Sequence, residues 1–136
     1  MRRIRVETKI ETGILEKSVL SKSECEEFIE IAKKYKLETK NDEVDEKPEL
    51  QLDIISDGGV IEELWEKCKP IYLNKLKPIL ASTPWIEPDQ RIYYVFLRKY
   101  DTAGRTHIPI HKDEGYLTMS FLLSDTKDFE GGEIYI

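Results

Sequence analysis

Residues 100–136, YDTAGRTHIPIHKDEGYLTMSFLLSDTKDFEGGEIYI, contain the pattern on which the predicted fold and function depend. One residue separates His111 from Asp113 in this stretch. Alternate side chains of an extended strand point to the same face, so the imidazole and the carboxylate would lie side by side. Such a pair supplies two of the three protein ligands of a 2-His-1-carboxylate iron site. A polar strand end that binds nothing is the alternative, because so short a motif often occurs by chance.

A strand-like pattern follows this motif. Residues 117–123 place apolar side chains on one face and a more polar set on the other, which is typical of a strand. A loop then leads to Gly131 and Gly132, and residues 133–136 follow as a second strand-like run. Adjacent glycines between strands indicate a turn with positive φ or a close approach of the backbone. The sequence therefore predicts two strands after the motif.

Together these features resemble the first half of the catalytic jelly roll of the 2-oxoglutarate and iron(II)-dependent dioxygenases. The similarity is greatest to the prolyl and lysyl hydroxylase branch of that family. It rests on features that occur in the family's order along the chain: a strand ending at residues 97–100, then His111 and Asp113, Thr118, residues 122–124 and residues 128–133. The resemblance covers residues 91–136, and before them only the architecture is similar.

The resemblance implies a set of site residues and cofactors. His111 and Asp113 would hold iron(II), and Tyr100 would donate a hydrogen bond to the distal carboxylate of the 2-oxoglutarate co-substrate. Thr118 would point its hydroxyl into the barrel and also contact the co-substrate. L-ascorbate is a further cofactor that the family suggests. The implied activity is the hydroxylation of a lysine or proline side chain in a peptide or of a related substrate.

Two elements of the family pattern do not occur in this sequence. The family's second histidine ligand and the basic residue that pairs with the 2-oxoglutarate carboxylate both belong to the second half of the jelly roll. From Asp113 to the last residue there are 136 − 113 = 23 residues, and neither element is among them. We therefore expect a C-terminally incomplete domain, truncated or split, that is inactive as an isolated chain.

The predicted fold class is α+β, an incomplete double-stranded β-helix (jelly roll) with two bracing helices on one face of a mostly antiparallel sheet. We expect a single domain over residues 1–136, in which residues 1–90 form a helical support region and residues 91–136 form the first half of the jelly roll. Helices are expected at residues 21–36 and 60–80. The expected strands are an N-terminal one from Ile4, then residues 50–55, 91–100, 117–123 and 133–136.

Local signals define several of these elements. Ser21 and Glu24 have the spacing of a capping box, which predicts a helix start. Pro70 falls inside the second helical pattern and is expected to kink or split that helix. Residues 38–49 are dense in charge and predict an exposed loop, which is either simply solvated or attracts a basic substrate or a divalent ion. Cys25 and Cys68 fall at apolar helical positions, which favours buried free thiols.

Composition excludes some classes of function. The net charge is −6 and the sequence pI is about 5.1, so a nucleic-acid partner is not expected. The sequence contains neither an apolar run of membrane-spanning length nor a signal-peptide core, which predicts a cytoplasmic protein. The partners expected are the co-substrate and a peptide substrate, together with self-association or complementation through the open C-terminal sheet edge.

Two alternatives to a dioxygenase remain open from the sequence. In the first alternative, the chain is a non-catalytic half jelly roll that binds another chain or serves a structural role. In the second it is a cupin-like metal protein with unrelated chemistry. The second alternative would call for more histidines than the two that the sequence contains.

Overall fold

The computed structural model describes residues 18–87 and 90–134. Helices α1 (Lys22–Ala32), α2 (Glu62–Ile71) and α3 (Lys77–Ala81) occur with strands β1 (Glu38–Asn41), β2 (Pro48–Ser56), β3 (Gly59–Val60) and β4 (Val95–Lys99). The predicted α+β class is therefore confirmed. The strand expected from Ile4 and the final residues 135–136 lie outside the described residues.

Strand β2 is the centre of an antiparallel four-stranded sheet. Leu50 pairs with Thr39 of β1 and with Lys99 of β4. Ile55 pairs with Val60 of β3 and Val95 of β4. Because one residue of β2 has a partner on each side, β4 lies along one edge of β2, while β1 and β3 share the other.

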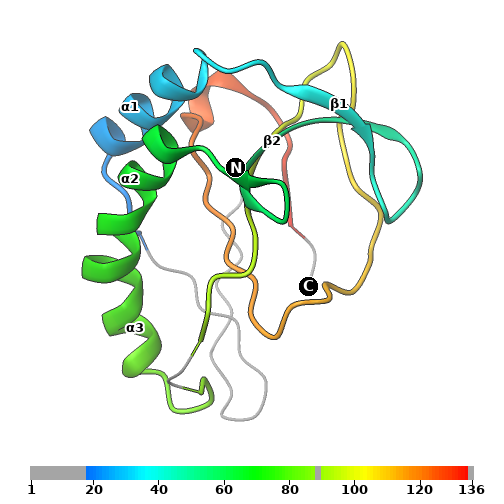
Figure 1. Ribbon diagram of the computed structural model, residues 1–136. Coiled ribbons are helices and arrows are strands. Elements are labelled where there is room, and N and C mark those ends of the chain that lie inside the picture. Colours follow the sequence, from blue (N-terminus) through cyan, green and yellow to red (C-terminus); the bar gives the residue numbers. More distant parts are fainter. Residues whose placement is uncertain (1–17, 88–89, 135–136) are drawn as a thin grey trace.

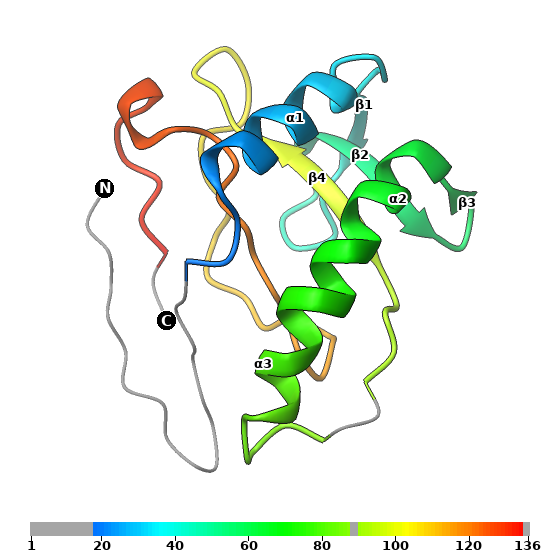
Figure 2. The same ribbon diagram turned by 90° about the vertical axis from the view of Figure 1, so that its left-hand side faces the viewer.

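The helices cover one face of this sheet, as Figures 1 and 2 show. The core between the two layers is built from alternate apolar positions of β2 and from one side of each main helix. Its buried members are Ile31, Ala32, Leu52, Ile54 and Leu64. Glu49, Gln51 and Asp53 occupy the intervening positions of β2, so their side chains point to the face away from the helices.

The predicted capping box at the start of α1 is confirmed. Glu24 N–H donates to the Ser21 hydroxyl over 3.1 Å, and Ser21 N–H donates to Glu24 Oε2 over 2.7 Å. These two bonds satisfy donors that the first turn of a helix otherwise leaves free. Helix α1 ends at Ala32, four residues before the predicted end.

The second helical region does not break at Pro70. α2 continues past this proline into a π-helical turn, η1 (Tyr72–Leu76), and then into α3. Pro78 has no N–H and its ring crowds the carbonyl four residues earlier, that of Asn74 inside the π turn. The widened turn relieves this conflict while the helical path goes on.

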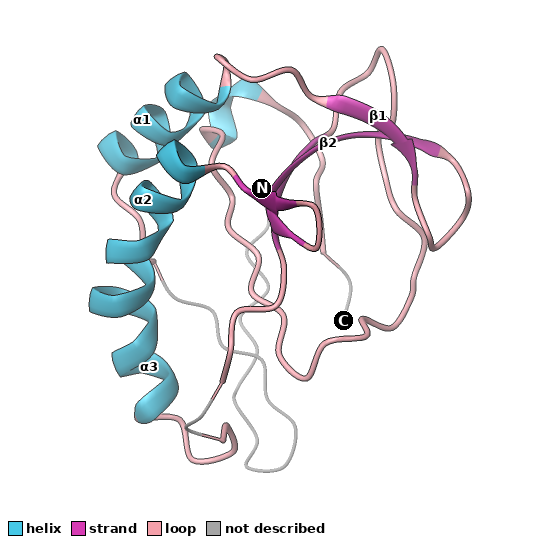
Figure 3. Cartoon of the chain, viewed as in Figure 1, coloured by secondary structure: helices cyan, strands magenta, loops and turns pink. Residues whose placement is uncertain are grey.

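The chain after β4 departs from the prediction. Residues 117–123 and 133–134 form no strand, and Figure 3 shows this part as loop, interrupted by the 3₁₀ turn η2 (Thr126–Asp128). Strand β4 is also shorter than the predicted 91–100, and it is not buried on both faces, because Phe96 is 42% exposed. Without a hydrogen-bonded neighbour, an alternating pattern alone does not make a strand.

Residues 38–49 are not simply a loop. Their first four residues are β1, which forms a hairpin with β2, and Asp42 and Glu49 are buried at its closed end. The charged sequence misled the prediction because an edge strand tolerates charge on its open side. No helix among the described residues is long and apolar enough to span a membrane.

Candidate functional site

His111 and Asp113 lie together although the segment that carries them is not a strand. His111 Nε2 is 3.0 Å from Asp113 Oδ1. The other ring nitrogen, Nδ1, is 2.8 Å from the carbonyl oxygen of Pro109. The structure therefore brings the two predicted iron ligands within contact distance, through a local bend and not through a shared strand face.

The hydrogen bond to Pro109 fixes the protonation of His111 at one nitrogen. A carbonyl oxygen can only accept, so Nδ1 must carry the hydrogen. Nε2 faces Asp113 Oδ1 at 3.0 Å, a contact that either a proton on Nε2 or a metal cation bound by both atoms accounts for. A histidine that donates one N–H to a backbone carbonyl and leaves the other nitrogen for a metal is the usual arrangement in metal sites.

The remaining predicted site residues do not join this pair. Tyr100 is 44% exposed and Thr118 is exposed, and within residues 18–87 and 90–134 no hydrogen bond links either of them to His111 or Asp113. His107 contacts the neighbouring Thr106 hydroxyl instead. Nor does the described part of the chain contain a group of three His, Cys, Asp or Glu residues placed to hold a metal.

The donor set therefore fits a divalent metal in part. An imidazole nitrogen and a carboxylate oxygen suit iron(II), manganese(II) and similar ions. Both side chains are accessible, with exposed fractions of 30% for His111 and 49% for Asp113, so an ion and its waters have access to them. Two protein ligands predict weak binding, because the remaining positions must be filled by water or by a co-substrate.

A buried polar network that the sequence patterns did not predict lies on the sheet face away from the helices. Arg98 of β4 lies between two buried carboxylates, with Nη1 at 3.1 Å from Asp42 Oδ2 and Nη2 at 2.8 Å from Glu49 Oε2. Its Nε and Nη2 also donate to Gln51 Oε1 over 3.2 and 2.8 Å. The guanidinium stacks over Phe96, 5.0 Å from the ring centroid. One arginine thus joins the hairpin to β4.

The two carboxylates in this network differ in acidity. Burial is the main cause that raises the pKa of Glu49 to about 7, and a proton shared with Asp42 adds to it. Burial would also raise the pKa of Asp42, but the contact with Glu49, the Val44 N–H and the charge of Arg98 outweigh it and lower that pKa. The Nη2 contact lacks hydrogen-bond geometry, so Glu49 Oε2 accepts no hydrogen bond from the described residues. Because its pKa is raised while that of Asp42 is lowered, Glu49 is the carboxyl of this pair that takes up a proton first as the pH falls.

The network continues along the same face toward Tyr94. Gln51 Nε2 donates to Asp53 Oδ1 over 2.6 Å and to the Tyr94 hydroxyl over 2.5 Å. The Tyr94 hydroxyl donates to Asp53 Oδ1 over 2.6 Å, and Lys40 Nζ lies 3.3 Å from Asp53 Oδ2. Lys40, Gln51, Asp53 and Tyr94 each have a partner, so this part of the network stabilises the packing of β1 and β2 against the chain at the start of β4.

A signal for this network was present in the sequence. Glu49, Gln51 and Asp53 alternate with the apolar positions of β2, and Arg98 interrupts the apolar run of residues 92–97. Polar residues on one face of a strand usually indicate a solvated face. Only the pairing of Gln51 with Arg98 across the sheet shows that here they meet each other.

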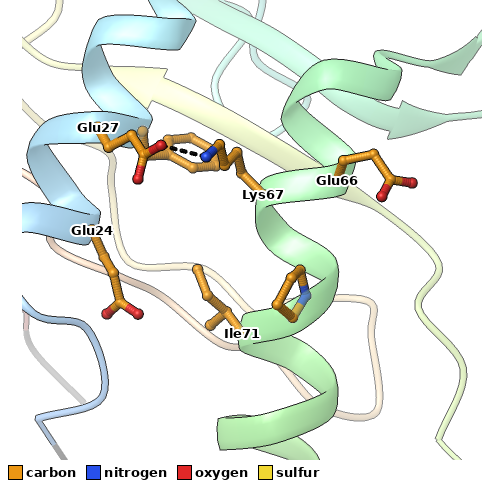
Figure 4. Close-up of a pocket in the computed structure, with 7 residues that line it drawn as sticks. Glu24, Glu27, Glu66, Lys67 and Ile71 are labelled. Atoms are coloured by element: carbon orange, nitrogen blue, oxygen red, sulfur yellow. Dashed lines mark hydrogen bonds and ion pairs between the residues drawn. The ribbon is translucent and has the colours of Figure 1, made fainter.

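A groove between α1 and α2 is a separate feature (Figure 4). Phe28, Pro70 and Ile71 line it together with Glu24, Glu27, Glu66 and Lys67. Its charges are largely paired, since Lys67 contacts Glu27 and Lys75 contacts Glu24. No predicted site residue lines this groove, so it carries no part of the candidate site.

Comparisons with protein-family models, with curated proteins and with solved structures each found no match.

Proposed function

We propose that this chain belongs to the iron(II) and 2-oxoglutarate-dependent dioxygenase lineage, with His111 and Asp113 as iron ligands. The observation that supports this most is the convergence of the two side chains at 3.0 Å, with Nδ1 of His111 held by the Pro109 carbonyl. That arrangement prepares Nε2 and a carboxylate oxygen for one cation. In this proposal the antiparallel sheet is part of a jelly roll whose remaining strands would lie over the face away from the helices.

Iron(II) in such a site supplies the activation of dioxygen that hydroxylation of a peptidyl lysine or proline, or of a related substrate, requires. The residues of this chain would bind the ion and orient the groups that contact it. Pro109 fixes the imidazole, Asp113 balances the charge of the ion, and both side chains leave part of the coordination sphere open. Tyr100 and Thr118 remain proposed contacts for the co-substrate, and each would have to approach the metal pair when the co-substrate binds.

An anaerobic titration with iron(II) and 2-oxoglutarate tests this proposal. The chelate of the co-substrate on protein-bound iron gives a weak visible charge-transfer band, which we expect for the unaltered chain. His111→Ala and Asp113→Ala should each abolish the band, because only one protein ligand would remain. His107→Ala is the matched control and should keep it. A band that survives both ligand substitutions, or no band at any iron concentration, would contradict the proposal.

A second candidate function is the binding of another polypeptide without catalysis. The observation that favours it is the exposure of large apolar side chains in the loop after β4, namely Ile110, Tyr116, Met119, Phe121, Leu122 and Ile134. Exposed large apolar side chains are a feature of many interaction surfaces. Sedimentation over a range of concentrations should then show self-association, which Phe121→Asp and Leu122→Asp should reverse. A monomer at every concentration would count against this candidate.

A further inference from the structure

Arg105 is the most deeply buried cation in the chain segment that leads to the metal pair. Its side chain is 6% exposed and that of its partner Asp45 is 13% exposed. The two form a bidentate ion pair, with Nη1 donating to Oδ1 and Nη2 to Oδ2, each over 2.9 Å. Nη1 also contacts the Lys47 carbonyl at 3.3 Å. Sixty positions separate these partners in the sequence, so the contact joins the β1–β2 hairpin loop to the chain after β4.

The same guanidinium also holds the chain that follows it. Arg105 Nε donates to the His107 carbonyl over 2.8 Å, and the Arg105 carbonyl accepts from Asp101 N–H over 3.1 Å. All three nitrogens of the guanidinium are therefore used, two on the hairpin loop and one on the backbone two residues ahead. A planar fork of donors makes this combination specific to arginine.

The segment from this anchor to the metal pair, residues 105–113, is here called the strap. In Figure 1 this part of the chain lies on the side of the sheet away from the helices. Within the strap Pro109 has a restricted φ, and its carbonyl accepts from His111 Nδ1 over 2.8 Å. Ile110 is 92% exposed and the metal pair itself is accessible. Packing therefore gives the pair little support.

We propose that Arg105 and Asp45 are positioning residues for the metal pair. Their buried ion pair fixes the start of the strap, so that His111 and Asp113 are already converged when a divalent ion arrives. This inference rests on the proposed function, because it assumes that the pair binds a metal. Loss of the anchor would leave both ligands in place but would add the cost of ordering the strap to metal binding.

Arg105→Lys and Asp45→Asn test the inference with Mn²⁺ as the probe, measured by calorimetry under argon. The lysine keeps the charge of Arg105 but cannot contact both Asp45 oxygens and the His107 carbonyl at once. We expect each variant to bind Mn²⁺ about tenfold more weakly, as is typical when outer partners of metal ligands are lost. Lys34→Met is the matched control, since Lys34 pairs with Glu63 in an exposed contact between the helices. This control should bind Mn²⁺ as the unaltered chain does.

Hydrogen exchange in the absence of metal gives a second readout. The Asp101 amide, which donates to the Arg105 carbonyl, should exchange faster in Arg105→Lys and Asp45→Asn, while the amides of β2 stay protected. If both variants bind Mn²⁺ as tightly as the unaltered chain, or if β2 loses protection together with Asp101, the positioning role is wrong. If the unaltered chain shows no Mn²⁺ binding that depends on His111, the proposed function itself fails. That outcome differs from a failure of the positioning role, because it is measured on the unaltered chain and not on the two variants.

Discussion

Glu49→Gln should remove the pH dependence of stability that the ionisation of Glu49 imposes. Glu49 is 3% exposed and its pKa is raised from 4.5 to about 7. Glutamine has nearly the same shape, cannot ionise, and can donate a hydrogen bond to Asp42 as the protonated carboxyl does. The substitution therefore removes the ionisation and keeps the packing.

The magnitude follows from proton linkage. A group whose pKa is higher in the folded state than in the unfolded state stabilises the fold while it is protonated. That contribution is complete below about pH 4.5 and is lost as the pH rises through about 7. At about 1.4 kcal/mol for each tenfold change in proton affinity, ionisation of Glu49 lowers the free energy of unfolding by up to about 3 kcal/mol.

Urea unfolding at a series of pH values between 5 and 8 is the assay, followed by far-ultraviolet circular dichroism. Near pH 5 the unaltered chain and Glu49→Gln should have similar free energies of unfolding, and near pH 8 the variant should be more stable by about 2–3 kcal/mol. Taking the difference between the two chains cancels the contributions that other titrating groups make to the free energy of unfolding in this range. If that difference does not change with pH, Glu49 ionises normally and the account of the network is wrong.

Three further results are expected from the fold. Leu64→Ala should destabilise the chain by about 2–5 kcal/mol in urea unfolding, because Leu64 is fully buried between α2 and the sheet. Ser21→Ala should cost about 1 kcal/mol by the same measurement, because it removes half of the capping box. The pKa values of Asp42 and Asp53 are lowered, so acid titration should show stability falling as the pH drops below about 3.8, and Asp53→Asn should weaken that dependence.

Local sequence signals predicted the elements whose causes are local. The Ser21 capping box starts α1 where expected, and the alternation of residues 50–55 becomes β2. The second helical region was also predicted, but Pro70 does not break it and the widening at Tyr72–Leu76 was not foreseen. A proline inside a helix predicts a lost hydrogen bond and a clash with the carbonyl four residues earlier. It does not determine how the helix accommodates them.

Features that depend on distant partners could not be predicted in this way. Burial of Glu49 requires Arg98, which approaches it only because β4 pairs with β2. Similarly, residues 117–123 have the composition of a strand but no paired neighbour in the part of the chain described, so they form no strand. The candidate metal pair was predicted by residue type, while its geometry comes from the Pro109 carbonyl instead of a strand face.

Paramagnetic broadening by Mn²⁺ in amide spectra of the ¹⁵N-labelled chain shows where the ion binds. Substoichiometric Mn²⁺ should broaden the signals of residues 110–115 first, and His111→Ala should remove this effect. Broadening centred on the acidic side chains of α1 or of the hairpin loop, or broadening that His111→Ala leaves unchanged, would contradict the claim that His111 and Asp113 form a metal site.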